Sequence, residues 1–346
     1  MNALTPFEIP VAIFTFKRIE KTLEIIDRIA QVKPHKIYII SDNGRNQEEI
    51  DLVKDLREKV EDKIDWDCKV IKKYASKNIG VYENIANGAK WVLQQEEFAI
   101  FLEDDNLPET TFFKFCQEML ALYKEDTRIL WICGTNYLKK YSPQDGSSYV
   151  FTKHMLPCGW ATWSHKFNKF YDGNLELWQN EYLNKRVRFE NTDKKLLKQD
   201  IGNWDRESRA IRKGFKPDSW DYQMSFTMRV HGLYAIVPMY NQIKNIGVDI
   251  NSIHGGTTFE YEMTRRFCGL ETTELDFPLI HPKAVLADLL FEKLTGKIIV
   301  LPWKERLKID VSMLLKKIFN VDVDESFSDE LKKKMQIKRY KITKKK

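Results

Sequence analysis

Residues 98–105 decide the predicted fold, and they read Phe98-Ala99-Ile100-Phe101-Leu102-Glu103-Asp104-Asp105. Five apolar residues in a row are typical of a strand that is buried on both faces of a parallel sheet. Three acids follow this strand directly, and adjacent carboxylates repel one another. Their position at the end of a buried strand therefore indicates a site that holds a cation.

Three similar apolar runs precede this one and predict further strands at residues 10–16, 36–40 and 68–71. Apolar residues spaced three or four apart between them predict helices at residues 19–29, 48–60 and 82–94. Strands that alternate with helices favour an α/β fold whose parallel sheet is covered on both faces.

Ligands of such sheets bind beyond the carboxyl ends of the strands. Polar or charged residues collect at all four predicted ends: Thr15-Phe16-Lys17-Arg18, Ser41-Asp42-Asn43, the stretch from Tyr74 to Gly80, and Glu103-Asp104-Asp105. The sequence therefore predicts a ligand site along this edge.

The acidic triplet suits Mg²⁺ or Mn²⁺, which prefer oxygen ligands and often combine one or two carboxylates with substrate phosphates. The alternative is that Asp105 or Asn106 caps a helix that begins after Pro108. Lys17-Arg18 opens a helix, where phosphate is stabilised. For this pair, the alternative is simple exposure to solvent.

Asp42 is placed to accept a hydrogen bond from the imide nitrogen of a nucleobase, unless it only forms an Asx turn with Asn43-Gly44. Lys77-Asn78-Ile79-Gly80 brings amides and a cation to the third strand end. Its alternative role is to cap the following helix.

After Asn106 the pattern changes. A helix at 109–123 and a strand at 129–133 lead to two aromatic segments that we expect to be irregular, residues 158–163 and 218–223. Beyond about Ala284 the sequence is helical and basic. We expect a nucleotide-sugar-binding half over residues 1–106, an acceptor and catalytic half over 107–285, and a C-terminal extension over 286–346.

Composition, charge and cysteine spacing limit the possible partners, metal sites and location of the protein. Of 346 residues, 43% are hydrophobic, and the net charge of +6 is concentrated near the C-terminus. That basic end suits an anionic membrane surface or a solvated terminus, and no motif supports nucleic-acid binding. The five scattered cysteines contain no C-x-x-C pair, which argues against a zinc knuckle. Without a signal-like or membrane-spanning run, we expect a cytoplasmic protein, and peripheral association with the inner membrane face is the further option.

Four short motifs follow one another along the chain in this order: Glu103-Asp104-Asp105, Gly159-Trp160, Trp220-Asp221 and Ser252-Ile253-His254-Gly255. Over residues 8–260 the chain resembles GT-A fold glycosyltransferases, in particular N-acetylglucosaminyltransferase I and its relatives. The Asn78-x-Gly80 region is similar to bacterial family 2 inverting transferases. The sequence departs from the pattern where Ile253 separates Ser252 from His254, and where one Asp stands in place of an Asp pair after Trp220.

The resemblance implies a mixed Rossmann-like sheet flanked by helices, and it implies roles for individual residues. Asp105 is the main metal ligand, and His254 is a candidate second ligand. Glu103 and Asp104 contact the ribose and the sugar, and Asp42 reads the uracil. The remaining donor-binding candidates are Thr15, Phe16, Arg18, Lys77 and Asn78. Asp221, between Trp220 and Tyr222, is the catalytic base.

The predicted activity is inverting, metal-dependent transfer of a sugar from a nucleotide sugar, with a UDP-sugar as the favoured donor, to a glycan or lipid-linked acceptor in envelope polysaccharide synthesis. A sugar nucleotidyltransferase is the first alternative, although the turn at Thr15-Phe16-Lys17-Arg18 lacks the glycines of that class. A non-catalytic nucleotide- or carbohydrate-binding protein is the second.

Overall fold

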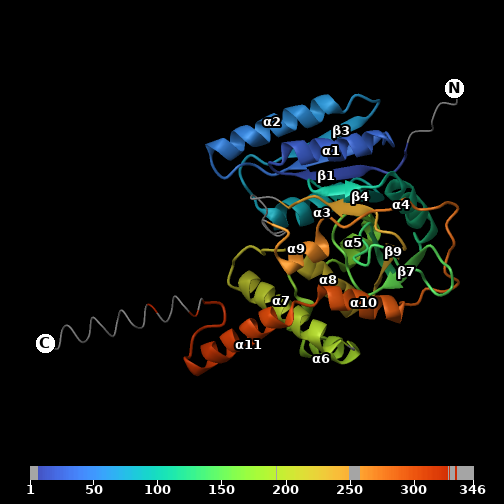
Figure 1. Ribbon diagram of the computed structural model, residues 1–346. Helices are drawn as coiled ribbons and strands as arrows, with labels where there is room; N and C mark the ends of the chain where they lie inside the picture. Colours follow the sequence, from blue (N-terminus) through green and yellow to red (C-terminus); the bar gives the residue numbers. More distant parts are fainter. Residues whose placement is uncertain (1–6, 192, 249–257, 326, 328–331, 333–346) are drawn as a thin grey trace. The chain divides into compact units, whose positions relative to one another are not determined.

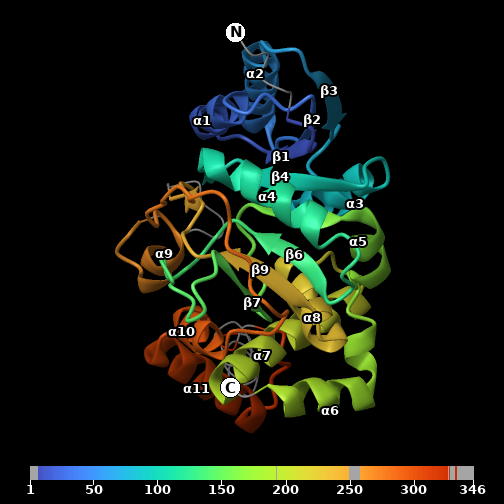
Figure 2. The same ribbon diagram turned by 90° about the vertical axis from the view of Figure 1, so that its right-hand side faces the viewer.

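The computed structural model describes residues 7–191, 193–248, 258–325, 327 and 332. The chain divides into two compact units at the junction of Ile299 and Val300 (Figures 1 and 2). Helix α10 (Leu289–Ile299), which falls in the extension expected from residue 286, belongs to the first unit.

The first four strands form the parallel half of the sheet. They are β1 (Val11–Thr15), β2 (Lys36–Ser41), β3 (Lys69–Tyr74) and β4 (Phe98–Glu103), in the spatial order β3-β2-β1-β4. All three pairings between neighbours are parallel, which confirms the prediction. The register pairs Phe14 with Glu103 and Thr15 with Ser41, so the polar segments that follow these strands lie along one edge.

Helices cover both faces of this half. On one face lie α1 (Ile19–Ala30) and α2 (Gln47–Lys63), and the apolar residues Ile25, Ile26 and Ile29 of α1 are fully buried there. On the other face a π-helical turn, η1 (Glu83–Asn87), continues into α3 (Gly88–Leu93).

The second half of the sheet is mixed. Strand β8 (Trp160–Trp163) pairs antiparallel with β4, and β6 (Ile129–Cys133), β9 (Tyr234–Pro238) and β7 (Tyr149–Thr152) follow it in space. The expectation that residues 158–163 are irregular is therefore wrong. Trp160 stacks between Phe101 and Trp131, at ring-centroid distances of 4.1 and 4.2 Å, and this packing places the short strand in the middle of the sheet.

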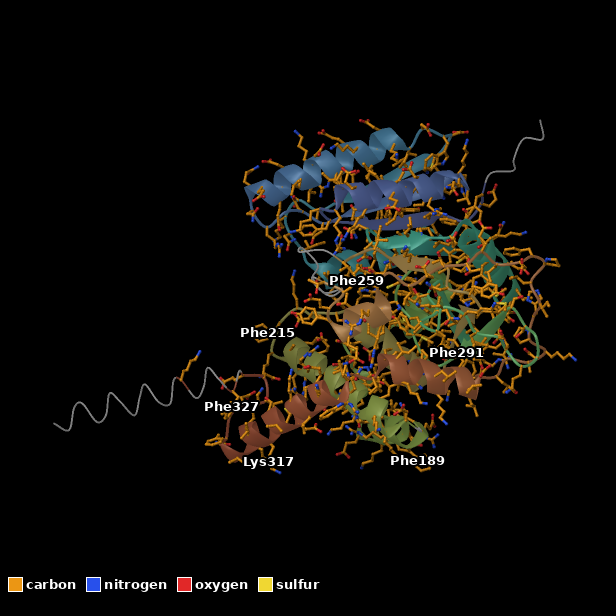
Figure 3. All side chains as sticks on the ribbon, in the orientation of Figure 1. Phe189, Phe215, Phe259, Phe291, Lys317 and Phe327 are labelled. Atoms are coloured by element: carbon orange, nitrogen blue, oxygen red, sulfur yellow. The ribbon has the colours of Figure 1, made fainter. Side chains whose placement is uncertain are left out.

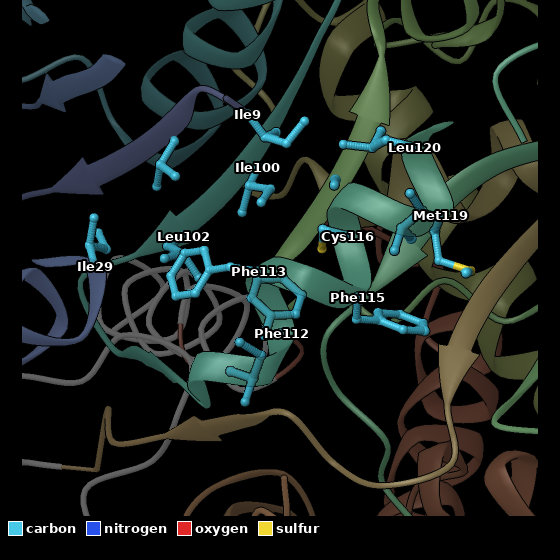
Figure 4. Packing of buried hydrophobic residues seen from close by; sticks show 14 of the residues in the cluster. Ile9, Ile29, Ile100, Leu102, Phe112, Phe113, Phe115, Cys116, Met119 and Leu120 are labelled. Atoms are coloured by element: carbon cyan, nitrogen blue, oxygen red, sulfur yellow. The ribbon is translucent and has the colours of Figure 1, made fainter. Parts of the chain in front are cut away.

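The remaining elements of the first unit surround this half. They are β5 (Asn106–Pro108), α4 (Thr110–Leu122), α5 (Ser164–Phe170), η2 (Leu177–Gln179), α6 (Glu181–Glu190), α7 (Lys194–Arg212), α8 (Asp221–His231), β10 (Ile243–Asn245), α9 (Glu262–Phe267) and α10. Strands β5 and β10 pair antiparallel as a separate small sheet. Figure 4 shows Phe112, Phe113 and Phe115 of α4 in the apolar layer with Ile100 and Leu102 of β4.

The second unit contains helix α11 (Trp303–Ile318), which begins directly after Pro302. In the described part of the chain, no helix combines the length and the apolar character needed to cross a membrane. The predicted fold class is confirmed: a mixed α/β sheet flanked by helices, with a helical C-terminal extension.

Candidate active site at the end of the fourth strand

Arg18 joins the first strand end to the fourth. Its Nη1 donates to Asp104 Oδ1 at 2.8 Å and to Asp105 Oδ2 at 3.1 Å. The backbone N–H of Phe16 donates to the other Asp104 oxygen at 3.1 Å. Because β1 and β4 are neighbours in the sheet, residues 88 positions apart in the sequence come into contact here. We call the three acidic residues Glu103, Asp104 and Asp105 the acid cluster.

Glu103 has no such partner. Among the described residues, its carboxylate accepts no hydrogen bond and forms no ion pair. Burial raises its pKa well above the usual value, and the charges of Asp105, Asp104 and Asp221 raise it further. A carboxylate in this position is costly when ionised, unless a cation or a donor group approaches it.

The acid cluster has more negative charge than Arg18 balances. Burial raises the pKa of Asp104 to about 6 and also raises that of Asp105, although Arg18 opposes both shifts. Lys21 lowers the pKa of Asp105 as well. The oxygen-only donor set and the uncompensated charge both fit a hard divalent cation such as Mg²⁺ or Mn²⁺.

Asp105 is held in place by its neighbour Asn106 and by residues 246–247. Its Oδ1 accepts from Asn106 Nδ2 at 2.6 Å, and its carbonyl accepts from the N–H of Ile246 at 2.8 Å. A Cβ on Gly247 would lie 2.3 Å from Asp105 Oδ2, so a larger residue there would displace the Asp105 side chain. The alternative that Asp105 or Asn106 caps the next helix is wrong, because the residue before α4 is Glu109 and Asn106 instead accepts from the N–H of Gly159 at 2.8 Å.

Asp221 is the first residue of α8. Its Oδ1 accepts from the hydroxyl of Ser219 and from the N–H of Tyr222, the latter at 3.1 Å, so neighbouring residues of its own turn orient the carboxylate. Its charge also raises the pKa of Glu103, which places the two carboxyl groups within electrostatic range. Asp221, at the start of α8, therefore lies near enough to the acid cluster to act on it electrostatically.

Asp42 follows the last residue of β2, and both oxygens of its carboxylate accept hydrogen bonds from other groups of the chain. Oδ1 accepts from the N–H groups of Asn43 at 2.7 Å and Ile79 at 2.8 Å. Oδ2 accepts from the N–H of Gly80 at 2.9 Å and from Asn78 Nδ2 at 3.1 Å. We call this arrangement the Asp42 turn: Asp42, Asn43 and residues 78–80.

The Asp42 turn explains two residue identities. Gly80 has φ +86°, a conformation that side chains other than glycine rarely adopt. Asn78 Nδ2 also donates to the carbonyl of Asn43 at 2.7 Å, which joins the ends of β2 and β3. Reading of a nucleobase by Asp42 stays a prediction, and it requires one of these internal donors to leave.

The other donor candidates have different surroundings. Thr15 is buried, and its hydroxyl has no hydrogen-bond partner in the described part of the chain. Lys77 is exposed at the tip of the turn. Lys17, expected either at phosphate or in solvent, instead donates to Glu49 at 2.8 Å and is half-buried.

A hollow of about 450 Å³ adjoins Arg18 on the side of α1 and α2, and its lining includes Lys17, Lys21 and Asn46. Among the described residues, neither Asp42 nor Asp221 contributes to it. The link between this hollow and the acid cluster is Arg18, which lines the hollow and donates to Asp104 and Asp105.

Two aromatic residues of the sequence motifs lie in the core. Trp160 is fully buried. Trp220 is buried as well, and its ring centroid lies 5.5 Å from that of Trp160. Neither ring offers an open face on which a sugar could stack.

His254 lies outside the described residues, as does the whole of residues 249–257. The chain leaves the described part at Val248, next to the Gly247 that contacts Asp105. Within the described ranges, no group of three or more His, Cys, Asp or Glu side chains is arranged to hold a metal ion. A cation held by one or two carboxylates and substrate phosphates needs no such group.

Sequence reasoning missed three neighbours of Asp105: Lys21, Asn245 and Gly247. Lys21 follows Arg18 by one helical turn, a spacing that marks it as a second cation on the same side of α1. Asn245 Oδ1 accepts from the N–H of Gly247 at 2.9 Å and its Nδ2 contacts Cys158 Sγ at 3.7 Å. No local pattern marks the last two, because a pairing of β10 with β5 brings them to the site.

These features define an α/β protein with a partly buried acid cluster at the edge of the parallel half of its sheet. No protein-family model matches the chain, and no curated protein sequence matches it. Some solved structures are similar at low identity. 4-Diphosphocytidyl-2C-methyl-D-erythritol synthase from Anaerococcus prevotii DSM 20548 is 12% identical with a TM-score of 0.35, over 69% of this chain and 92% of that chain.

S. aureus TarS 1–349 is 13% identical with a TM-score of 0.37, over 68% of this chain and 59% of that chain. Mouse xyloside xylosyltransferase 1 is 12% identical with a TM-score of 0.35, over 64% of this chain and 80% of that chain. At these values the function has to be inferred from the residues of this chain itself.

Proposed function

We propose that this chain is an inverting glycosyltransferase that uses a nucleotide sugar, most simply a UDP-sugar, together with Mn²⁺ or Mg²⁺. One observation carries the proposal: a partly buried acid cluster of three carboxyl groups contacts Arg18 at the start of α1, and Asp221 of α8 lies within electrostatic range of Glu103. A buried excess of carboxylates is costly for a fold, and it is typical of sites that bind a charged ligand.

The donor would lie along the edge of the parallel strands. Asp105 and Asp104 would hold the cation, which, when bound, supplies Lewis-acid stabilisation to the departing diphosphate. Arg18, at the start of α1, is placed to neutralise phosphate oxygens, and His254 is proposed as a further ligand. Glu103 would face the ribose or the sugar.

The base would lie against the strand ends β2 and β3. Asp42 fixes Asn78 and Gly80 by its internal hydrogen bonds, so the Asp42 turn forms a defined wall for the base. Phe16 and Lys77 complete the proposed donor contacts at either side of this turn, and Thr15 supports it through its carbonyl, which accepts from the N–H of Asp42 at 3.1 Å.

The reaction forms a bond between the acceptor hydroxyl oxygen and the anomeric carbon while the anomeric C–O bond to the diphosphate breaks. Asp221 takes the proton of the acceptor hydroxyl. Ser219 and Tyr222 orient its carboxylate through Oδ1. Attack from the face opposite the leaving group inverts the anomeric centre. The acceptor would be a glycan or a lipid-linked sugar of envelope polysaccharide synthesis.

A panel of nucleotide sugars tests the proposal. With Mn²⁺ and no acceptor, the wild-type protein should slowly release UDP from at least one UDP-sugar, and EDTA should stop the release. When pyrophosphate is added, a sugar nucleotidyltransferase would instead consume it and form UTP and a sugar 1-phosphate, whereas a binding protein would release nothing. Either of these results would contradict the proposal. Asp65→Asn, an exposed carboxylate outside the site, is the control and should behave as wild type.

A further inference from the structure

Helix α11 has an apolar stripe that remains exposed in the structure. Trp303, Leu307, Val311, Leu314 and Ile318 follow one another at spacings of four, four, three and four residues, which places them on one face of a helix. Each of the five is between 46% and 63% exposed, and no residue of α11 is buried. Soluble helices normally cover such a face with their own core.

Basic residues border this stripe on both sides. At 100° per residue, Lys304 and Lys308 lie along one border, and Arg306 and Lys317 lie along the other together with the acidic Asp310. Helix α11 contains five basic and two acidic side chains. In the sequence that follows, residues 319–331 add five acidic and no basic residues, and Lys332–Lys346 adds nine basic and no acidic residues. Lys317 extends from the C-terminal end of α11 in Figure 3.

We infer that this face of α11 lies in the surface of an anionic lipid bilayer. An apolar stripe that includes a tryptophan enters the acyl boundary of such a bilayer, while flanking lysines and arginines reach the acidic headgroups. A second copy of the chain would cover the apolar stripe equally well, but the net positive charge of α11 opposes pairing of two identical helices and favours a surface of opposite charge.

This inference goes beyond the proposed transferase activity and does not depend on it. If both hold, the first unit acts beside a membrane, where a lipid-linked acceptor is available. Binding to lipid is measured without nucleotide sugar, so failure of one leaves the other to be judged separately.

The test uses the full chain and two kinds of vesicle, phosphatidylcholine alone and phosphatidylcholine with phosphatidylglycerol. The wild-type protein should sediment with the second kind only, and high salt should release it. Leu307→Ser/Leu314→Ser should reduce the bound fraction about tenfold or more. Phe189→Ser is the control, because Phe189 on α6 is 84% exposed and lies outside α11 (Figure 3).

Trp303 provides a second readout. It is 63% exposed, whereas the other eight tryptophans of the chain are buried or half-buried. Brominated lipid should therefore quench part of the wild-type tryptophan fluorescence, and Trp303→Phe should bind vesicles but lose that quenching.

Three results would overturn the inference. The first is unchanged vesicle binding by Leu307→Ser/Leu314→Ser, which would assign the binding to the basic C-terminus alone. The second is self-association in sedimentation velocity that this double variant abolishes, which would assign the stripe to a second copy of the chain. The third is absence of binding to the anionic vesicles.

Discussion

Two carboxylate sites lie at strand ends on either side of β1 in the same sheet, and they are built in opposite ways. In the Asp42 turn, one carboxylate accepts four hydrogen bonds from groups 1 to 38 residues away, two on each oxygen. In the acid cluster, three carboxylates share one guanidinium and few other donors, and Glu103 accepts none among the described residues.

The difference separates structure from function. A buried carboxylate whose acceptor positions are all filled stabilises the fold, and its loss leaves donors unpaired. A cluster whose charge is not balanced destabilises the fold on its own and stabilises whatever cation or ligand completes it. The comparison therefore predicts large losses of activity with small losses of stability at one site, and the reverse at the other.

The largest expected effect is at Asp221. Asp221→Asn should lower the rate of sugar transfer by about 10²–10⁴-fold, because the amide cannot accept the acceptor's proton. The measurement is the transfer rate at saturating donor, with calorimetric donor binding alongside it. Donor affinity should remain within about twofold, since the loss of a base acts on the chemical step rather than on ground-state binding.

Asp218→Asn is the matched control, because Asp218 is exposed and lies only three residues away. Full transfer by Asp221→Asn would remove this residue from the catalytic role.

Next in size is the Asp42 turn. In Asp42→Asn an NH₂ group replaces one oxygen, and on either oxygen it would face two N–H donors. The free energy of unfolding should fall by about 3 kcal/mol. Urea denaturation measures the change, with Asp65→Asn as the exposed control. A loss below about 0.5 kcal/mol would show that these hydrogen bonds contribute little.

A smaller effect concerns the pH dependence of stability in the metal-free protein. The folded-state pKa of Asp104 is raised from 3.8 to about 6, so this group's contribution is fully present below about pH 4 and is lost as pH rises through 6. Asp104→Asn should therefore flatten the fall in stability between pH 4 and 6, by about 2 kcal/mol.

Urea denaturation at several pH values in EDTA gives this slope. An unchanged slope in Asp104→Asn would mean that the carboxyl groups of the acid cluster do not destabilise the metal-free protein. The contrast with the Asp42 turn would then disappear.

The smallest effect is expected at Lys77. Its side chain is exposed, so Lys77→Ala should change the free energy of unfolding by less than about 0.5 kcal/mol. If Lys77 contacts the donor, the same variant should weaken donor binding several-fold, as calorimetry would show. Equal donor affinity would remove Lys77 from the proposed site and leave the rest of the edge as described.

The first half of the fold was predictable because its signals are local. Residues 98–102 form a continuous apolar run, and Ile25, Ile26 and Ile29 repeat at helical spacing on α1. Strand β8 was missed because it has only four residues, and its pairing with β4 and the stacking of Trp160 place it in the sheet. Neither contact leaves a periodic pattern in the sequence.

The candidate site was predictable in outline only. Acids after a buried strand identify the acid cluster, and the order of the strand ends brings Arg18 to it. The direct contact of Arg18 with Asp104 depends on the pairing of β1 with β4, and the contacts of Asp42 with Ile79 and Gly80 depend on the pairing of β2 with β3. Such contacts between distant residues are not encoded in any one stretch of the chain.

Calorimetric titration of UDP into the protein with Mn²⁺ tests the central claim most directly. The wild-type protein and Asp65→Asn should bind UDP in Mn²⁺ and lose that binding in EDTA, and Asp105→Asn should bind at least tenfold more weakly in Mn²⁺. Equal, metal-dependent affinity in wild type and Asp105→Asn would contradict the claim that the acid cluster holds the cation and the nucleotide.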